Sequence, residues 1–361
     1  PASSHLRSRR MGRFLLSLRL FLCLSPTVVL GFSPSRTSFG LKRSLRRWGW
    51  VKLEGGEWEW QEEDPGYRVP AYPGLEKEEE EEEDHPPKAT PKLPSGSFHP
   101  KQSLGQNYIN DGNTVHKILR AFHDDATKDG REIHNIIEMG PGAGALTDAL
   151  VKIYGVECLE CIELDTRAID LLNGKHPQLK VHHDDVLQVN YPAMAREQGR
   201  PLVVVGNLPF YITSQILFCL ADASHVGAID CATVTMQWEV ADRMVAPTNC
   251  KDYGILSVVF QTYANVKRHF KIRNTVFYPK PKVDSALVGL HFLRPEQLRR
   301  RLAGVDPVDF RRVVTTAFRQ RRKTMRKNLR HLVLHDICDG DKERAAAIFN
   351  TAAPALPKSV Q

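Results

Sequence analysis

The chain has 361 residues, of which 42% are apolar and 25% are charged, a composition typical of soluble globular proteins. This composition excludes wholesale disorder, a collagen-like fibre and a protein with many membrane spans, and the length allows two or three domains. The formal net charge is +8, and seven cysteines are too few for a disulfide scaffold.

Residues 1–50 are predicted to be a targeting leader. A positive residue precedes the largely apolar run Phe14–Leu30, and small residues stand before a cut at Phe32, as in a secretory signal peptide. Arg19 interrupts the run and argues against a membrane-spanning helix. From Phe32 the chain resembles the bipartite leaders of proteins imported into complex algal plastids. We therefore expect an organellar protein of the plastid, with no stable membrane association once the leader is removed. A mitochondrial presequence is the alternative, because no acid precedes Glu54.

Residues 51–100 are predicted to be a disordered acidic linker. They contain Gly, Pro and Trp without an apolar period, and the acidic run Glu78–Asp84 repels itself and cannot be buried. The alternative interpretation is that this run shields a basic segment elsewhere in the chain.

Strands and helices are predicted to alternate over residues 101–293. The pattern indicates a doubly wound parallel sheet of the Rossmann-like α/β class, with its ligand site at the carboxyl ends of the strands. Cys158 and Cys161 form the one C-x-x-C, but strand alternation places them on opposite faces, so no metal site is expected. The expected strands are Ile133–Glu138, Val156–Glu163, Leu179–His183 and Leu202–Gly206, and the expected helices are Ala145–Lys152 and Thr166–Asn173.

Polar residues follow each expected strand in an order that indicates an S-adenosylmethionine site. Gly140, Gly142 and Gly144 form a loop that lets backbone approach a nucleotide-like ligand, although a turn needing positive φ explains the loop equally well. Glu163 ends the second strand, where a carboxylate can accept both hydroxyls of a ribose. Asp185 is placed for an adenine amino group, and its neighbour Asp184 is the alternative.

The tetrad Asn207-Leu208-Pro209-Phe210 after the fourth strand indicates methylation of an exocyclic amine. The N6 amine of adenine is a poor nucleophile, because its lone pair is conjugated with the ring. An Asn oxygen and a backbone carbonyl can accept both amine protons and turn the lone pair toward a methyl donor. Pro209 stiffens the loop, and Phe210 offers a ring face to an extruded base. Such chemistry requires positioning rather than a metal or a strong base.

With these motifs the chain resembles the ribosomal RNA adenine dimethyltransferase family, which modifies two adjacent adenosines near the 3′ end of small-subunit rRNA. The resemblance implies S-adenosylmethionine as cofactor, the class I methyltransferase fold, and small-subunit rRNA or a pre-ribosomal particle as partner of a monomeric enzyme. It also implies that Phe210 and Phe277 stack on the target base, and it assigns the cofactor contacts to Asn107, Ile109, Gly140, Glu163, Asp185 and Asn207. The matching stretches are Gly105–Ile109, Glu138–Gly144, Cys161–Asp165, Gly206–Thr213, Val276–Ser285 and Gln320–Leu329.

Several of these residues have alternative interpretations. Asn107 has the residue type of a helix N-cap, Asn207 is an alternative cap for the expected helix Ile212–Leu220, and Phe277 is an alternative core residue. Phe210 replaces a Tyr that is common in the family. The family usually continues through one more short helix, which predicts that the natural protein extends beyond Gln361.

Residues 294–361 are predicted to form a small helical domain that binds rRNA. Apolar residues in 306–319 recur at helical spacing, and residues 294–330 carry 13 Lys or Arg against 3 Asp or Glu. Such a run is often only a solvated face, but a block this dense favours a polyanion. The expected phosphate contacts are Arg319, Arg321, Arg322, Lys323, Arg326 and Lys327.

Two other functions fit parts of the pattern. A methyltransferase of large-subunit rRNA shares nearly all cofactor motifs, but such enzymes commonly have Ile at the position of Leu208. A non-catalytic ribosome-assembly or organellar transcription factor is the other alternative, and the intact Asn207 and glycine loop argue against it.

Overall fold

The computed structural model describes residues 48–52, 58–62, 100–101, 104–128, 130, 132–320 and 322–352. The expected leader (1–50) and linker (51–100) lie outside the described residues, apart from Pro100 and two short strands. Among the described residues, no helix is both long and apolar enough to cross a bilayer.

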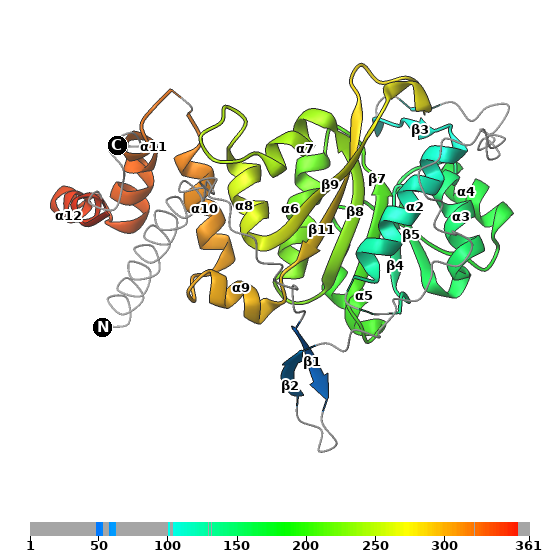
Figure 1. The fold of residues 1–361 in the computed structure, drawn as a ribbon. Coiled ribbons are helices and arrows are strands. Elements are labelled where there is room, and N and C mark those ends of the chain that lie inside the picture. Colours follow the sequence, from blue (N-terminus) through cyan, green and yellow to red (C-terminus); the bar gives the residue numbers. More distant parts are fainter. Residues whose placement is uncertain are drawn as a thin grey trace, which may run out of the picture.

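A seven-stranded sheet lies at the centre of the molecule (Figure 1). Its strand order is β6-β5-β4-β7-β8-β11-β9; the first five strands are parallel, and β11 is antiparallel to both of its neighbours. This confirms the doubly wound α/β architecture predicted from the sequence. The strand order reverses between β4 and β7, where such sheets bind ligands. The strands are β4 (Ile136–Met139), β5 (Leu159–Glu163), β6 (Lys180–His183), β7 (Leu202–Asn207), β8 (Ile229–Gln237), β9 (Ala264–Ile272) and β11 (Ser285–Phe292).

Helices cover both faces of this sheet. Helices α2 and α3 pack on one face, and α5, α6, α7 and α8 pack on the other. Figure 1 shows α10, α11 and α12 at the opposite end of the molecule from α3 and α4. The helices are α2 (Gly112–Ala126), α3 (Ala145–Tyr154), α4 (Thr166–Lys175), α5 (Tyr191–Glu197), α6 (Thr213–Ser224), α7 (Trp238–Val245), α8 (Ile255–Tyr263), α9 (Pro295–Arg301), α10 (Pro307–Ala317), α11 (Met325–His331), the π-helical η4 (Leu332–Ile337) and α12 (Lys342–Ala352).

Side-chain caps fix where several helices begin. The Asp111 carboxylate accepts from the backbone N–H of Thr114 at 2.8 Å and starts α2. Asp306 accepts from Val308 N and is followed by a proline in the first turn of α10. Both patterns satisfy backbone donors that a helix N-terminus leaves unpaired.

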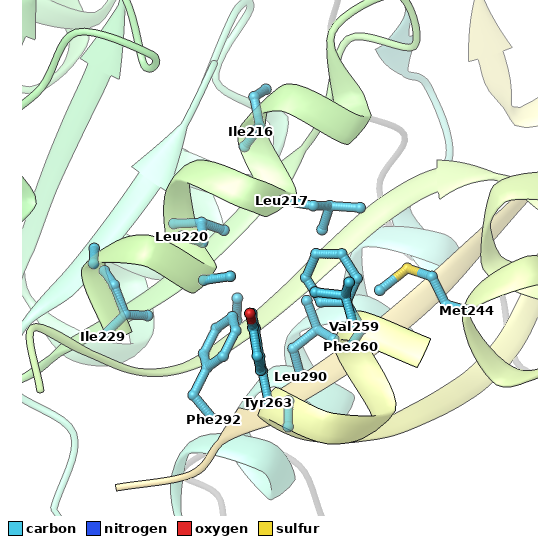
Figure 2. Packing of buried hydrophobic residues seen from close by; sticks show 14 of the residues in the cluster. Ile216, Leu217, Leu220, Ile229, Met244, Val259, Phe260, Tyr263, Leu290 and Phe292 are labelled. Atoms are coloured by element: carbon cyan, nitrogen blue, oxygen red, sulfur yellow. The ribbon is translucent and has the colours of Figure 1, made fainter. Parts of the chain in front are cut away.

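The hydrophobic core is divided by the sheet into two clusters. In β4, Ile136 joins the cluster under α2 and α3, whereas Ile137 joins the opposite one, as strand alternation requires. Figure 2 shows side chains of α6, α8 and β11 meeting in the cluster on the face opposite α2 and α3, with Phe260 and Tyr263 of α8 among them. That cluster continues into the C-terminal helices, for example at Phe310 of α10, so the helical segment shares its core with the sheet.

Two details differ from the sequence predictions. The structure contains an antiparallel pair, β1 (Trp48–Lys52) with β2 (Trp58–Glu62), in which Trp50 aligns with Trp60. The prediction of a structureless linker from residue 51 is therefore wrong for these strands, whose W-x-W spacing is a period of two. The expected strand Val156–Glu163 is also too long, since Val156–Cys158 form a 3₁₀ turn and only β5 is a strand.

Candidate active site

The glycine loop leaves the carboxyl end of β4 beside the end of β7. Gly140, Gly142 and Gly144 have φ of +64°, +54° and +86°, a region that favours glycine. A Cβ on Gly140 would meet no atom within 4 Å, whereas one on Gly142 would lie 2.5 Å from the ring of Tyr108. The lack of a side chain at Gly140 therefore leaves open space, and its lack at Gly142 lets the ring of Tyr108 pack against the backbone.

A cavity of about 250 Å³ lies next to this loop. Its wall includes residues 104–108, which belong to a segment (104–109) that we call the strap. The remaining wall comes from residues at and after the ends of β4, β5, β6 and β7 and from the start of α6. Of the predicted cofactor and tetrad residues, the wall contains Asn107, Gly140, Gly142, Glu163, Asp185, Asn207, Leu208, Pro209 and Phe210.

Glu163 is fixed by backbone donors at the end of β5. One carboxylate oxygen accepts from Gly142 N at 3.0 Å, and the other accepts from Leu164 N at 2.8 Å and Asp165 N at 2.9 Å. Burial raises the pKa of this carboxyl above its ordinary value, and the three N–H donors oppose that shift. Carboxylate oxygens have lone pairs left for ribose hydroxyls.

Both aspartates after β6 reach the cavity wall. Asp185 accepts from Leu187 N at 2.9 Å, and Asp184 accepts from Asp185 N at 2.8 Å. Asp185 is the partly buried member of the pair and Asp184 the exposed one. The shielded position favours Asp185 as the group facing an adenine.

Asn207 is bound on both sides at the end of β7. Its amide nitrogen donates to the backbone carbonyl of Asn107 at 2.7 Å, and its carbonyl oxygen accepts from the hydroxyl of Thr235. The N-cap position of α6 is Ile212 and no side chain caps this helix, so the alternative of Asn207 as a helix cap is wrong. Asn107 is not a cap either, because Asp111 caps α2 and Asn107 donates to Gly105 O at 3.1 Å.

The other tetrad residues have distinct environments. Leu208 is 1% exposed and supports the loop from the core. The carbonyl of Pro209 accepts from the Thr213 hydroxyl at 2.9 Å, which ties the loop to the first turn of α6. Phe210 is partly exposed at the cavity, as a base-stacking ring should be.

Two predicted site residues are core residues instead. Phe277 is 4% exposed and Ile109 is 2% exposed, and neither lines the cavity. They lie opposite each other in the short pair formed by β3 (Tyr108–Ile109) and β10 (Phe277–Tyr278). A ring packed in a core has no free face, so the structure corrects the stacking role of Phe277 and supports its alternative as a core residue.

Asp165 lies beside the site and makes contacts that the sequence analysis did not predict. Its buried carboxylate binds Arg167 at 2.6 Å, Gln106 at 3.0 Å and Lys101 at 3.2 Å. These partners, Arg167 first, hold the pKa of Asp165 well below its usual range. The contacts fasten the strap to the loop after β5. An Asp immediately before an expected helix is a detectable N-cap signal, which identifies the position but not the contacts to the strap.

The expected phosphate contacts lie on the surface of the C-terminal helices. Arg319, Arg322, Lys323, Arg326 and Lys327 are all exposed, whereas Arg321 lies outside the described residues. Within the part of the chain that the structure describes, none of these five pairs with a carboxylate, and the guanidinium of Arg326 lies 5.4 Å from the ring of Phe349. Their charges are thus available to an anionic partner.

Comparison with known proteins identifies the family. A model of the family described as "Ribosomal RNA adenine dimethylase" matches residues 97–352. The chain belongs to this family. The dimethylase therefore uses S-adenosylmethionine, and the predicted enzyme class is confirmed.

Curated relatives agree with this assignment, and one solved structure shares the fold. The dimethylase is 39% identical over 246 residues to ribosomal RNA small subunit methyltransferase A of Chlorobium chlorochromatii, covering 67% of this chain and 86% of that protein. It is 37% identical over 237 residues to the protein of the same name from Pseudomonas aeruginosa, with 64% and 82% covered. A crystal structure of a dimethyladenosine transferase from Plasmodium falciparum shares the fold, with a TM-score of 0.51 at 21% identity over 69% of this chain and 82% of that one.

The residues around the cavity fit S-adenosylmethionine. Open space beyond Gly140 admits a ligand against the backbone, and Glu163 offers acceptors for ribose hydroxyls. Asp185 would hold the adenine of the cofactor, and the strap would hold its amino acid portion. Among the described residues, no group of three or more His, Cys, Asp and Glu is arranged to hold a metal ion.

Proposed function

We propose that this dimethylase transfers methyl groups to N6 of two adjacent adenosines near the 3′ end of small-subunit rRNA, and thereby aids ribosome biogenesis. The proposal rests on the two hydrogen bonds, to Asn107 and Thr235, that fix the side-chain amide of Asn207 at the cavity. Relatives named as small subunit methyltransferases support small-subunit rRNA as the substrate.

The geometry of Asn207 defines its role toward the target amine. Its nitrogen is committed to Asn107, so its oxygen is the side-chain atom left to accept an N–H of adenine, in addition to the Thr235 hydroxyl. A carbonyl oxygen has two lone pairs and can accept both. A backbone carbonyl of the tetrad would accept the second amine proton, and the partly exposed ring of Phe210 would support the base.

This chain contributes to the chemistry by positioning the target amine toward the methyl donor. When bound, S-adenosylmethionine supplies an electrophilic methyl group on a sulfonium. The amine becomes nucleophilic once its lone pair is turned out of conjugation, which Asn207 enforces by accepting in a fixed direction. The exposed cations of the C-terminal helices hold rRNA phosphates. Because phosphate contacts carry no sequence information, the shape of the RNA and the active-site pocket select the target.

The setting of the reaction is also part of the proposal. The leader interpretation supports an organelle, with the plastid preferred to the mitochondrion, and we expect a monomer that acts on rRNA or a pre-ribosomal particle without stable membrane attachment. Fusing residues 1–50 to a fluorescent protein tests the compartment. A cytosolic signal would contradict the organellar assignment.

The substrate is tested with the full chain and labelled cofactor. Organellar small subunits lacking the modification and organellar large subunits are incubated separately with the enzyme, and the modified nucleotides are mapped. Label on two neighbouring adenosines near the 3′ end is the expected result. Label confined to large-subunit rRNA would overturn the proposal, and the Asn207→Ala variant gives the background.

A further inference from the structure

We propose that Tyr278, Lys280 and Lys282 form a binding surface for the single RNA strand that flanks the methylated nucleotide. These three residues, here called the ledge, comprise the last residue of β10 and two residues of the segment that joins β10 to β11, and they have no role in the site described above. The proposal rests on the proposed function in one respect, namely that the substrate is RNA.

The register of the sheet places the ledge at the same edge as Asn207. Asn207 of β7 aligns with Thr235 of β8. Two residues further along β8, Gln237 aligns with Ser285 of β11, which in turn aligns with Ile272 of β9. Residues 273–284, which join β9 to β11, therefore leave the sheet beside the catalytic tetrad.

The short strand β10 places Tyr278 on the same face as Tyr108, which lines the cofactor cavity. Tyr278 lies opposite Tyr108, and opposite residues of an antiparallel pair project from the same face. The ring of Tyr108 covers Gly142 and lines the cavity, while Phe277 on the other face enters the core. Tyr278 is 48% exposed, so it presents a ring to solvent beside the cavity.

Hydrogen bonds close the base of the loop that carries the ledge. Asn274 donates from its backbone N to Asp284 Oδ1 at 3.0 Å and from its side chain to Pro281 O at 3.2 Å. Trp238 N donates to Asp284 O at 3.0 Å. The loop is thus closed at its base, and a preformed surface loses less entropy on binding than a loose one.

The charge around the ledge is positive and only partly compensated. Residues 264–284 contain six Lys or Arg and one acid. Lys271 pairs with that acid, Asp284, at 2.9 Å, and Arg268 pairs with Asp242 and lies 4.4 Å from the centre of the Trp238 ring. Lys280 and Lys282 are exposed, and among the described residues neither has a carboxylate within ion-pair distance.

An exposed aromatic ring beside uncompensated lysines matches the chemistry of single-stranded nucleic acid. Bases stack on aromatic rings irrespective of sequence, and lysines neutralise the phosphates between them. An acidic protein surface would use the lysines but would gain little from the ring of Tyr278. The two parts of the ledge can therefore be tested separately.

The lysines are tested by the salt dependence of binding. Full-length Lys280→Ala/Lys282→Ala enzyme is titrated against a fluorescent single-stranded RNA 12-mer that contains two adjacent adenosines. The slope of log K against log salt should fall by roughly 0.7 for each lost phosphate contact. The matched control is Lys152→Ala/Arg200→Ala, which removes two exposed cations near the opposite edge, at the end of α3 and before β7. The control should keep the wild-type slope, and cofactor affinity should stay unchanged in both.

The ring is tested by replacing Tyr278 with Ala and with Phe. Loss of one stacked base should weaken binding of the 12-mer about 5- to 100-fold in Tyr278→Ala, whereas Tyr278→Phe keeps the ring face and should bind normally. In methylation assays Tyr278→Ala should raise KM for RNA more than it lowers kcat. A merely structural role would instead lower the melting temperature and shift both parameters.

The outcomes distinguish this proposal from the proposed function. Unchanged binding and salt slope in the lysine variant and in Tyr278→Ala would overturn the ledge, even if the wild type methylates rRNA. A defect seen only with assembled particles and not with the 12-mer would also overturn it, since it would indicate a protein contact. If the wild type methylated no rRNA, the proposed function would fail, while the binding comparison would still decide the ledge.

Discussion

The side-chain amide of Asn207 donates to the backbone carbonyl of Asn107 at 2.7 Å, across 100 residues of sequence. A backbone carbonyl only accepts hydrogen bonds, so the nitrogen of Asn207 must face the strap and its oxygen must face Thr235. The strap that lines the cofactor cavity therefore also sets the orientation of the amide proposed to orient the target amine.

Thr235→Val should lower turnover without loss of the fold. The change removes the hydroxyl that holds the Asn207 oxygen, a hydrogen bond worth about 0.5–1.5 kcal/mol, so we expect a decrease in kcat of roughly 2- to 10-fold. Asn207→Ala should cost about 10²–10³ in rate. Single-turnover methylation at saturating RNA and cofactor measures both. Near-normal turnover of Asn207→Ala with a lowered melting temperature would show that Asn207 is only structural.

The sequence predicted the parts of the site that follow from order along the chain. Strand–helix alternation was enough to predict the sheet, and polar residues after successive strands were enough to predict that the glycine loop, Glu163 and Asn207 lie together at one end of it. Contacts between distant segments were not predictable in this way, and Asp165 with Lys101 and Gln106 is the clearest case. Phe277 was misassigned because a two-residue strand has no period from which to tell the buried face from the exposed one.

Gly142→Ala should impair cofactor binding beyond the effect of backbone strain. A Cβ there would lie 2.5 Å from the Tyr108 ring, so the ring must move away from the cavity. Gly199→Ala is a matched control, because Gly199 has a similar φ of +69° and open space around it. Both variants should lose about 1–2 kcal/mol of stability from the left-handed backbone. Calorimetry should show weaker cofactor binding for Gly142→Ala alone, and equal affinities would contradict the role of Tyr108.

Glu163→Ala should weaken cofactor binding and leave RNA binding unchanged. The substitution removes the ribose acceptor and leaves three backbone N–H groups near the cavity without their partner. We expect a loss of about 1–3 kcal/mol in cofactor affinity. Cofactor affinity is measured by calorimetry and RNA affinity by filter binding. Equal weakening of both would show that Glu163 acts through the fold and not through the ribose.

Arg322→Ala/Lys323→Ala should weaken RNA binding and flatten its salt dependence. Both side chains are exposed near the start of α11, away from the cofactor cavity. Each lost phosphate contact reduces the slope by roughly 0.7–0.9. Cofactor affinity serves as the control and should not change. A slope equal to that of the wild type would mean that these side chains are only solvated.

Glu138 should make the stability of the protein fall as the pH rises from about 4.5 to about 8. This glutamate is 1% exposed in β4, and burial raises its pKa from an ordinary 4.5 to about 8. The unfolded chain releases the proton at lower pH than the folded chain does. The stabilising contribution is therefore complete below about pH 4.5 and is lost as the pH rises through about 8, at roughly 1.4 kcal/mol per pH unit within that window.

The Glu138→Gln variant isolates this contribution from all other titrating groups. Gln has nearly the same shape but keeps no charge at high pH, so the variant should gain stability relative to the wild type between pH 6 and pH 9. Urea unfolding at intervals across this range gives the difference in free energy directly. Glu197→Gln, an exposed position on α5, is the control and should show no such trend. A difference between Glu138→Gln and the wild type that stays constant with pH would mean that Glu138 does not change its protonation in the folded protein over this range.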